Sequence, residues 1–278
     1  MEVGGVAAVT GAGQGIGLGV TAALAQRGFD VLALVLESSM EDAVRAATQD
    51  AKGDVRVDVL DVTNPGNFAF PDDLRVVVNN AGVRRAYLPV EMSEPEEWRA
   101  TFDVNFFGLV EMTRRAIPAL RAAGRGVICN ISSAALHSRC SPFLAPYRTS
   151  KAAVSALCES LRIELAPFGV RIVEIMPGPT VSGINADSIL RRIADAVEFP
   201  DYAPMAELQF GYSKAVPGAT PADVAGEMIV DAILDDAGPM RYGTDAVSNA
   251  GLEKWRHTPD EEAMEETLER YAALIAKR

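Results

Sequence analysis

The sequence has few of the residues that bind metals or form disulfides. Its 278 residues include only two histidines, His137 and His257, and no carboxylate cluster joins either of them at a metal-ligand spacing. A catalytic metal is therefore not expected. The three cysteines, Cys129, Cys140 and Cys158, are an odd number without a CxxC pair. We expect free thiols in a reducing compartment, which favours a cytoplasmic location.

The sequence also lacks long apolar runs and an excess of positive charge. No stretch of about eighteen uncharged apolar residues occurs, so no membrane span is predicted. The N-terminus carries Glu2 and no basic segment, so it is not expected to be a secretory signal. The 26 basic and 38 acidic residues give a formal net charge of -12, which argues against nucleic acid as a partner. Apolar residues make up 49% of the chain, enough for one α/β domain over residues 1–278.

The N-terminal segment predicts a β-α-β unit. A short apolar run at residues 5–9 leads into a glycine-rich turn at 10–17, then an amphipathic stretch, Gly28 and a second apolar run at 31–36. In this context glycines permit a tight turn and a close approach to a pyrophosphate, which the first helical N–H groups then face. The alternative is a glycine-rich connection without a ligand. We predict a dinucleotide site whose residues here are Gly11, Gln14, Gly15, Ile16 and Gly17.

Glu37, at the end of the second strand, bears on the choice of dinucleotide. A carboxylate here can accept hydrogen bonds from both adenosine ribose hydroxyls and repels a 2′-phosphate. No Arg or Lys stands at Leu36, Ser38 or Ser39 to bind such a phosphate. The pattern favours NAD, with NADP as the alternative; Glu37 as a solvated strand end is the other interpretation.

Two further strand ends predict a wall of the same site. Asp61 follows the strand near residue 56 and could accept from the adenine amino group, with Val62 packed on the ring; the alternative is a turn-starting Asp. A buried strand at 74–78 ends in residues predicted to contact the cofactor, namely Asn80, Ala81 and Gly82. Ligands of open parallel sheets bind outside such carboxyl ends.

Arg84 and Arg85 come directly after this strand end. They are either solvated or guide an anionic substrate, and the solvated interpretation is the favoured one.

Tyr147 and Lys151 lie four residues apart in a helical pattern, so they share one face of the helix. An ammonium beside a phenol stabilises the phenolate, which suits a group that exchanges a proton with an alcohol or carbonyl oxygen. A chance surface pair is the alternative. Asn105 stands within an apolar helical stretch at 98–120, where it is either a satisfied core amide or a group that holds a water.

The remaining pattern predicts the fold class. Strands near residues 6, 32, 56, 76, 128 and 172 alternate with helices, and residues 240–242 suggest one more. This periodicity predicts a single α/β domain with a doubly wound parallel sheet of about seven strands and helices on both faces. Residues 180–218 are expected to form a substrate-binding loop or lid with one helix at 189–197, and residues 259–277 a C-terminal helix. The apolar residues of that lid either line a substrate pocket or pack ordinarily: Tyr202, Met205, Leu208, Phe210 and Tyr212.

These residues together resemble the classical short-chain dehydrogenase/reductase family, whose fold is Rossmann-like. The resemblance covers roughly residues 4–180 and rests on motifs that occur in the family's order: TGAGQGIG at 10–17, NNAG at 79–82, the tetrad Asn105, Ser133, Tyr147 and Lys151, and Pro177-Gly178. Within the family, the segments at 106–108, 157–161 and 167–170 look most like hydroxysteroid and retinol dehydrogenase members.

The resemblance implies hydride transfer between a nicotinamide and a secondary alcohol or ketone. Tyr147 would exchange the proton, Lys151 would support Tyr147 and hold the nicotinamide ribose, Ser133 would bind the substrate oxygen, and Asn105 would position a water. Ser133 lies fourteen residues before Tyr147, one more than expected, and Ser132 is a rival for its role. The family's acid at the end of the second strand aligns nearer Val35 than Glu37.

The resemblance further implies cofactor contacts from Pro177, Gly178 and Thr180, and a homodimer or homotetramer. The apolar and aromatic residues of the lid suggest a substrate with an apolar body of steroid, retinoid or long-chain type. An NADPH-dependent carbonyl reductase is the alternative enzyme. A non-catalytic dinucleotide sensor and a nucleotide-sugar epimerase are alternatives from other classes; the intact tetrad argues against the sensor, and the GxxxGxG spacing against the epimerase.

Overall fold

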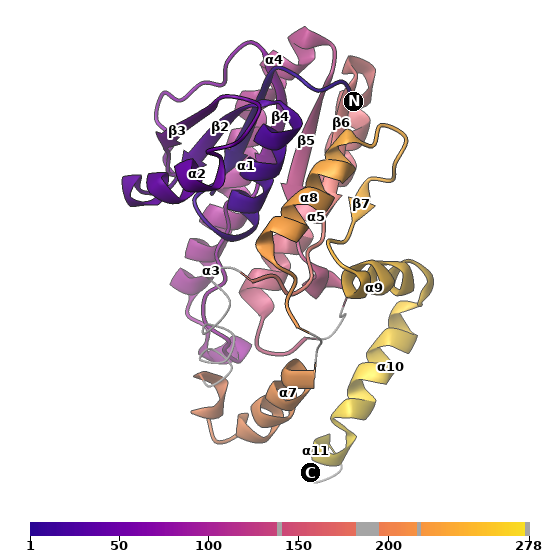
Figure 1. Ribbon diagram of the computed structural model, residues 1–278. Coiled ribbons are helices and arrows are strands. Elements are labelled where there is room, and N and C mark those ends of the chain that lie inside the picture. The colour runs from indigo at the N-terminus through magenta and orange to yellow at the C-terminus, as the bar shows by residue number, and fades with distance from the viewer. Residues whose placement is uncertain (138–140, 182–194, 216–217, 276–278) are drawn as a thin grey trace.

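The computed structural model describes residues 1–137, 141–181, 195–215 and 218–275, and its centre is a seven-stranded sheet in the order β3-β2-β1-β4-β5-β6-β7 (Figure 1). Every neighbouring pair of strands is parallel, which confirms the predicted doubly wound sheet. The strands are β1 (Val6–Thr10), β2 (Asp30–Val35), β3 (Val55–Val59), β4 (Leu74–Asn79), β5 (Gly126–Ile131), β6 (Val170–Ile175) and β7 (Arg241–Tyr242).

The position of β1 between β2 and β4 decides where a ligand can bind. The chain first builds outward from β1 to β2 and β3, then returns to the other side of β1 with β4. The loops after β1 and β4 therefore diverge at the carboxyl edge of the sheet, which is the place where open α/β sheets bind ligands.

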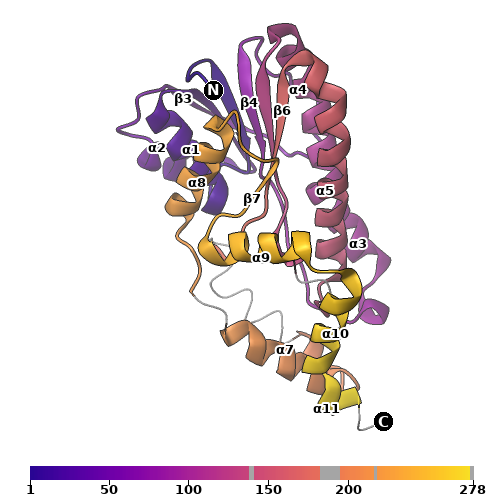
Figure 2. The same ribbon diagram turned by 90° about the vertical axis from the view of Figure 1, so that its right-hand side faces the viewer.

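Helices cover both faces of the sheet (Figure 2). On one face lie α1 (Gly15–Arg27), α2 (Glu41–Ala47) and α8 (Ala222–Leu234); on the other lie α4 (Leu109–Ala123) and α5 (Ala145–Leu165). Each layer buries its own apolar cluster against the sheet. Helices α1 and α8 pack closely where Gly19 and Gly226 meet. A Cβ at Gly226 would lie only 2.3 Å from the Gly19 carbonyl carbon, so a larger residue would not fit there.

The helical stretch expected at 98–120 is divided into three parts. Helix α3 (Pro95–Phe102) passes into a π-helical turn, η3 (Asp103–Gly108), before α4 begins. Turns of this kind occur often at functional sites. Asn105 lies inside the turn and is fully buried.

The C-terminal third differs from the sequence-based expectation. Helix α7 (Ala203–Ala215) stands where an irregular segment was expected, α9 (Ala246–His257) was not anticipated, and the expected helix at 259–277 is divided into α10 (Asp260–Arg270) and α11 (Ala272–Ile275). Figure 1 shows α7, α9 and α10 beyond the carboxyl edge of the sheet. The helix expected at 189–197 lies mostly outside the described residues.

Candidate active site

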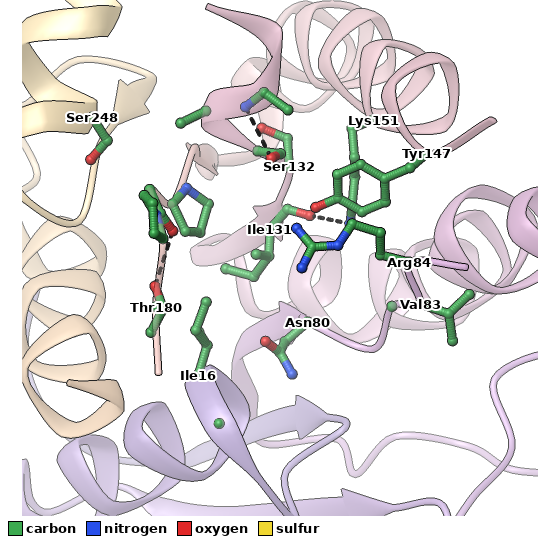
Figure 3. Close-up of a pocket in the computed structure, with 18 of the residues that line it drawn as sticks. Ile16, Asn80, Val83, Arg84, Ile131, Ser132, Tyr147, Lys151, Thr180 and Ser248 are labelled. Atoms are coloured by element: carbon green, nitrogen blue, oxygen red, sulfur yellow. Dashed lines mark hydrogen bonds between the residues drawn. The ribbon is translucent and has the colours of Figure 1, made fainter. Parts of the chain in front are cut away.

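A cavity of about 960 Å³ runs along the carboxyl edge of the sheet (Figure 3). It collects residues from the ends of β1, β3, β4, β5 and β6 and from α5, α9 and α10. Most of the residues that the sequence predicted for cofactor and catalysis line it: Gly11, Gln14, Gly15, Ile16, Asp61, Val62, Asn80, Ala81, Gly82, Ser133, Tyr147, Lys151, Pro177, Gly178 and Thr180.

Three predicted residues do not line the cavity: Gly17, Glu37 and Asn105. Gly17 lies beneath the glycine turn, where a Cβ would stand 2.1 Å from the Gly11 carbonyl oxygen, so it permits the turn to pack. Glu37 is exposed, and its Oε2 accepts from the Ser39 hydroxyl at 3.3 Å. Leu36, the residue before it, lines the cavity instead.

The glycine turn leaves hydrogen-bond donors at the start of α1. Gln14, the residue before the helix, makes no side-chain capping bond. Its side chain therefore does not occupy the first N–H groups of α1, which lie beside the cavity. Gly11 has a φ of +65°, a conformation that glycine adopts without strain. A polyanion fits this place, because a helix N-terminus attracts negative charge.

Asn80 fixes the turn to the neighbouring strand. Its Nδ2 donates to the carbonyl oxygens of Thr10 at 3.0 Å and Gly11 at 3.1 Å. In return the Thr10 hydroxyl accepts from the backbone N–H groups of Asn80 and Ala81 at 3.0 and 3.1 Å. This cross-connection holds the two diverging loops as a rigid cradle, and the dinucleotide predicted from the sequence fits it.

The adenosine end of the cradle is apolar around Leu36 and Met40, which both line the cavity. Asp61, at the same end, starts a turn, as the alternative interpretation of this residue predicted. Its Oδ1 accepts hydrogen bonds from the N–H and the hydroxyl of Thr63, both at 2.8 Å. Asp61 also lines the cavity, so the turn fixes the carboxylate at its edge. Val62 is buried and packs against Gly108.

Lys151 is buried beneath the catalytic end of the cavity, with 4% of its surface exposed. Its Nζ donates to the Ile131 carbonyl at 2.8 Å and lies 5.9 Å from the centre of the Tyr147 ring (Figure 3). Burial disfavours the ammonium and lowers the pKa of Lys151 to about 8. The helical spacing predicted from the sequence therefore places the cation next to the phenol.

Ser132 and Ser133 have different surroundings, which the sequence could not separate. The Ser132 hydroxyl is 2% exposed and donates to the Ile175 carbonyl at 3.1 Å. The Ser133 oxygen accepts from the Ala135 N–H at 3.1 Å, and this bond leaves the Ser133 O–H to donate toward the cavity. Both serines line the cavity, and Ser133 stays the predicted partner of the substrate oxygen.

Asn105 does not line the cavity but holds the backbone of Val83, which does. Its Oδ1 accepts from Val83 N at 2.7 Å, and its Nδ2 donates to Val83 O at 2.9 Å and to Ser150 Oγ at 3.0 Å. The first of the two expected readings, a satisfied core amide, describes these contacts. The water at Asn105 stays a prediction.

The C-terminal helices α9 and α10 line one side of the cavity, which was not expected from the sequence. The contributing residues are Val247, Ser248, Gly251, Lys254, Trp255, Thr258, Ala263, Glu266, Thr267 and Arg270. A local signal existed, because Asp245 and Ser248 form a capping box that starts α9. That signal predicts the helix but says nothing about its packing partner.

His137 also lines the cavity and was not selected for chemistry. Its Nε2 lies 3.3 Å from the Met176 sulfur, and its ring lies 6.0 Å from the Trp255 ring. Burial, with a smaller effect from Arg256, lowers the pKa of His137 to about 4, so the ring is neutral at pH 7.

The aromatic residues expected at an apolar substrate pocket divide into two groups. Tyr202 and Met205 pack against the cluster of Phe143 and Leu144, and the rings of Tyr202 and Phe143 meet edge to face at 6.2 Å. Neither residue lines the cavity, although Tyr147, which does, packs against the same cluster. This is the ordinary packing that was the alternative reading. The side chains of Phe210 and Tyr212 lie outside the described residues.

A parallel sheet with a glycine cradle at its switch point, and a Tyr, a Lys and a Ser around one adjoining cavity, defines a dinucleotide-binding α/β protein. The sequence matches the short chain dehydrogenase family over residues 5–191, and the chain belongs to that family.

Three similar proteins agree with this assignment. The chain is 34% identical over 180 residues to human 11-beta-hydroxysteroid dehydrogenase type 2, covering 61% of this chain and 44% of that protein. It is 32% identical over 192 residues to mouse retinol dehydrogenase 16, covering 66% and 59%. The crystal structure of a short chain dehydrogenase from Burkholderia cenocepacia J2315 in complex with NADP superposes with a TM-score of 0.71 at 26% identity, covering 96% and 99%.

The predicted hydroxysteroid and retinol dehydrogenase neighbours are thus confirmed, although the chain aligns with less than two thirds of the length of either. Among the described residues, no helix has the length and apolar character needed to cross a bilayer. The same residues hold no group of three or more His, Cys, Asp or Glu side chains arranged to bind a metal ion.

Proposed function

We propose that this protein is an NAD(P)-dependent oxidoreductase that transfers a hydride between the nicotinamide and a secondary alcohol or ketone. One observation carries the proposal: Tyr147, Lys151 and Ser133 border the same cavity that the glycine cradle opens. When bound, the dinucleotide supplies or accepts the hydride, and the protein supplies orientation and proton transfer.

Each side chain has a role that follows from its contacts. In the oxidation direction Tyr147 removes the hydroxyl proton of the alcohol. Lys151, held by the Ile131 carbonyl, stabilises the negative charge of the phenolate and would hold the nicotinamide ribose. Ser133 donates its O–H to the substrate oxygen and stabilises the charge that develops there.

The cradle residues hold the dinucleotide. The N–H groups at the start of α1, beside Gln14, Gly15 and Ile16, bind the pyrophosphate. Asn80, Ala81 and Gly82 form the wall on the β4 side, and the adenine end borders Asp61 and Val62. The remaining cofactor contacts come from residues that follow β6: Pro177, Gly178 and Thr180.

NAD is the proposed cofactor, with NADP as the alternative. The support no longer comes from Glu37, which does not line the cavity. It comes from Leu36, Met40 and Gln14, since these lining residues near the end of β2 offer no cation to a 2′-phosphate. NADP in the Burkholderia cenocepacia enzyme keeps the alternative open for this chain.

The proposed substrate has an apolar body of steroid, retinoid or long-chain type. The names of the two mammalian relatives support this class, as do the apolar lining residues Val247, Trp255 and Ala263. Residues 180–218 are proposed to cover the substrate, with α7 beyond the same edge of the sheet (Figure 2). The alternative, an NADPH-dependent carbonyl reductase, would use the same site to catalyse the reverse reaction.

A homodimer or homotetramer is proposed through the outer faces of α4 and α5. Large apolar side chains lie exposed there or nearby: Phe107, Ile163 and Phe168. Light scattering coupled to gel filtration tests the state. A cytoplasmic location stays a prediction, consistent with Cys129 and Cys158, which are buried free thiols.

The test is a pair of variants measured by nicotinamide absorbance and by calorimetry of cofactor binding. Tyr147→Phe should abolish turnover of an alcohol panel and leave cofactor affinity within a few-fold. Lys151→Ala should lose both. Normal turnover by Tyr147→Phe would end the proposal. If the wild type binds NAD or NADP tightly but neither oxidises nor reduces any compound of the panel, the result favours a non-catalytic dinucleotide sensor.

A further inference from the structure

His137 borders the cavity, and the function proposed above assigns it no role. It follows Ser133 by a single 3₁₀ turn, η4 (Ala134–Leu136), and is half-buried. Because a turn of this kind rises about 2 Å per residue, His137 lies roughly 8 Å further along the wall than Ser133. It is therefore placed beside the body of a bound substrate and not beside the oxygen that reacts.

The two ring nitrogens of His137 have different surroundings. Nε2 lies 3.3 Å from the sulfur of Met176. A thioether sulfur carries no hydrogen and accepts weakly, so we assign the proton of the neutral ring to Nε2 and the lone pair to Nδ1. In the part of the chain that the structure describes, no group hydrogen-bonds to Nδ1, and this atom is not enclosed. A hydrogen-bond acceptor is thus left at the cavity wall.

The charge of His137 limits what this acceptor can bind. Burial lowers the pKa of His137 to about 4, an effect that Arg256 strengthens and Asp245 opposes. The imidazole is therefore uncharged at pH 7 and offers no cation to a carboxylate or a phosphate. A lone pair on Nδ1 attracts a neutral O–H donor instead.

Gly251 keeps Nδ1 uncovered. Both His137 and Gly251 line the cavity, and a Cβ at position 251 would lie 3.0 Å from Nδ1. Gly251 stands inside α9, where glycine is less favourable than alanine by about 1 kcal/mol. Its φ is not in the left-handed region, so the backbone does not require glycine there. The close approach of the imidazole is the contact that requires it.

Trp255 supplies the apolar part of the same wall. Its ring lies 6.0 Å from that of His137, and the two planes are inclined by 33°. The Arg241 guanidinium lies 5.4 Å from the centre of the indole, and Trp255 also lines the cavity. An apolar surface beside one acceptor suits an apolar molecule that carries one hydroxyl.

We propose, on the basis of the function proposed above, that His137 determines substrate specificity by accepting a hydrogen bond at Nδ1 from a second hydroxyl of the substrate. This hydroxyl lies at the end of the apolar body away from the reacting carbon, since one 3₁₀ turn separates His137 from Ser133. The substrate class is a ketone, or the corresponding secondary alcohol, whose apolar body carries a remote hydroxyl. The reaction leaves that hydroxyl unchanged, and the group only orients the molecule.

The test compares three ketones that share one rigid skeleton. The first is 4-(2-hydroxypropan-2-yl)acetophenone, whose tertiary hydroxyl cannot be oxidised. In 4-tert-butylacetophenone a methyl group replaces that hydroxyl, and in 4-(2-methoxypropan-2-yl)acetophenone an ether oxygen can accept but not donate. Calorimetric titration of each ketone into the NAD-loaded protein measures Kd without turnover, because the ketone and the dinucleotide are both oxidised.

Three variants alter the acceptor, and one is a control. His137→Phe keeps a ring and removes both nitrogens, whereas His137→Asn keeps an acceptor near the position of Nδ1. Gly251→Ala leaves the imidazole in place and puts a methyl group 3.0 Å from Nδ1. The matched control is His257→Phe, which changes the exposed histidine that ends α9 and does not line the cavity. Melting temperature confirms that each variant folds.

The measured quantity is the Kd of the tert-butyl ketone divided by the Kd of the hydroxyl ketone, taken for each protein. His137→Phe should lower this ratio about 3- to 10-fold relative to the wild type, which is the size of one net hydrogen bond. Gly251→Ala should lower it by a similar factor, and His137→Asn should recover part of the loss. His257→Phe should leave the ratio unchanged. The methoxy ketone should bind the wild type no more tightly than the tert-butyl ketone.

A ratio that His137→Phe leaves unchanged, or a wild type that binds none of the ketones, would overturn the role of His137. A methoxy ketone that binds as tightly as the hydroxyl ketone would overturn the choice of a hydroxyl as the recognised group. Reduction of 4-tert-butylacetophenone by NADH reports separately on the proposed function. Turnover with an unchanged ratio keeps the oxidoreductase and refutes the His137 site; the expected change of ratio without turnover of any ketone refutes the function and supports the site.

Discussion

The side-chain amide of Asn105 holds both backbone groups of Val83, accepting from its N–H at 2.7 Å and donating to its carbonyl at 2.9 Å. The same Nδ2 donates to Ser150 Oγ at 3.0 Å, and that hydroxyl donates to the Tyr147 carbonyl at 2.7 Å. One buried amide thus connects the loop after β4, the π-helical turn and α5. The loop carries Arg84, and α5 carries Tyr147.

Asn105→Ala removes these bonds at once. It leaves the Val83 N–H and carbonyl without their partner, so we expect a loss of about 2 to 4 kcal/mol in the free energy of unfolding, measured by urea denaturation. Asn64→Ala, at an exposed asparagine, is the control and should change the stability by no more than about 0.5 kcal/mol. Equal stability of the two variants would refute the connecting role.

The two serines after β5 should separate in kinetics. Ser133→Ala removes the donor to the substrate oxygen, and we expect kcat to fall roughly 100- to 1000-fold. Ser132→Ala removes a hydroxyl that donates to Ile175, which should cost about 1 kcal/mol of stability and leave kcat within a few-fold. The reverse ranking in steady-state assays would assign the role to Ser132.

Cofactor choice should respond to Leu36 rather than to Glu37. Leu36→Arg places a cation at the cavity edge, where it should lower the Kd for NADP about 10-fold by pairing with the 2′-phosphate. Glu37→Gln should leave the Kd for NAD within about two-fold, because the Glu37 carboxylate does not line the cavity. Calorimetry measures both. A large loss of NAD affinity in Glu37→Gln would restore the ribose contact expected from the sequence.

The buried ammonium of Lys151 predicts a pH-dependent stability. Its pKa is about 8 in the folded chain and about 10.4 in an unfolded one. Between these values the unfolded state binds more protons, so the contribution of Lys151 to stability rises with pH, and it is most unfavourable below pH 8.

Without cofactor, Lys151→Met should therefore gain stability relative to the wild type by about 3 kcal/mol at pH 7. The difference between the two proteins should narrow by about that amount between pH 7 and pH 10.5, since all other titrating groups are shared. Urea unfolding across this range measures it, and a difference independent of pH would contradict the burial cost assigned to Lys151.

Glu174 and the half-buried Arg241 form an ion pair between β6 and β7. Glu174 is fully buried, and its Oε2 accepts from Arg241 Nε at 2.8 Å and from the Ser155 hydroxyl at 3.1 Å. Arg241→Met should destabilise the protein by about 3 to 5 kcal/mol, because it leaves a buried carboxylate without its cation. Adding Glu174→Gln should recover part of that loss in urea denaturation. A double variant less stable than Arg241→Met alone would show that the pair is not coupled.

The same arginine connects this pair to the cavity. The Arg241 guanidinium lies 5.4 Å from the centre of the Trp255 ring, and Trp255 lines the cavity. Loss of Arg241 should therefore also change tryptophan fluorescence in the folded protein. An emission spectrum identical to the wild type would indicate that Trp255 does not depend on the stack.

Several parts of the molecule could be predicted from local patterns. The strands near residues 6, 32, 56, 76, 128 and 172, and the last one near 241, are where the apolar runs placed them. The conformation of the glycine turn and the shared helix face of Tyr147 and Lys151 depend only on residues a few positions apart. Both could therefore be predicted without knowledge of the tertiary structure.

Other features could not be predicted because they depend on contacts distant in sequence. Asn105 could not be assigned a partner, since its partners are the backbone of Val83 and a hydroxyl on α5. The capping box at Asp245 predicts a helix start, but the packing of α9 and α10 along the cavity depends on the path of the chain after β7. The segment with α7 contains glycine and proline at its ends, and its composition concealed the helix.

By itself the sequence determined the seven strands, the helices between them up to residue 180 and the glycine turn, and it predicted Tyr147 and Lys151 as the proton-transferring groups, because short-range periodicity and spacing decide each of these. Only the tertiary structure decided that Leu36 rather than Glu37 borders the cavity, that the Ser132 hydroxyl donates to Ile175 while the Ser133 oxygen accepts from Ala135, and that Arg84 lies beside Tyr147 while Arg85 pairs with Glu97. The physical reason is that a side chain just after a strand end can point only into the space that the neighbouring strands and helices do not fill.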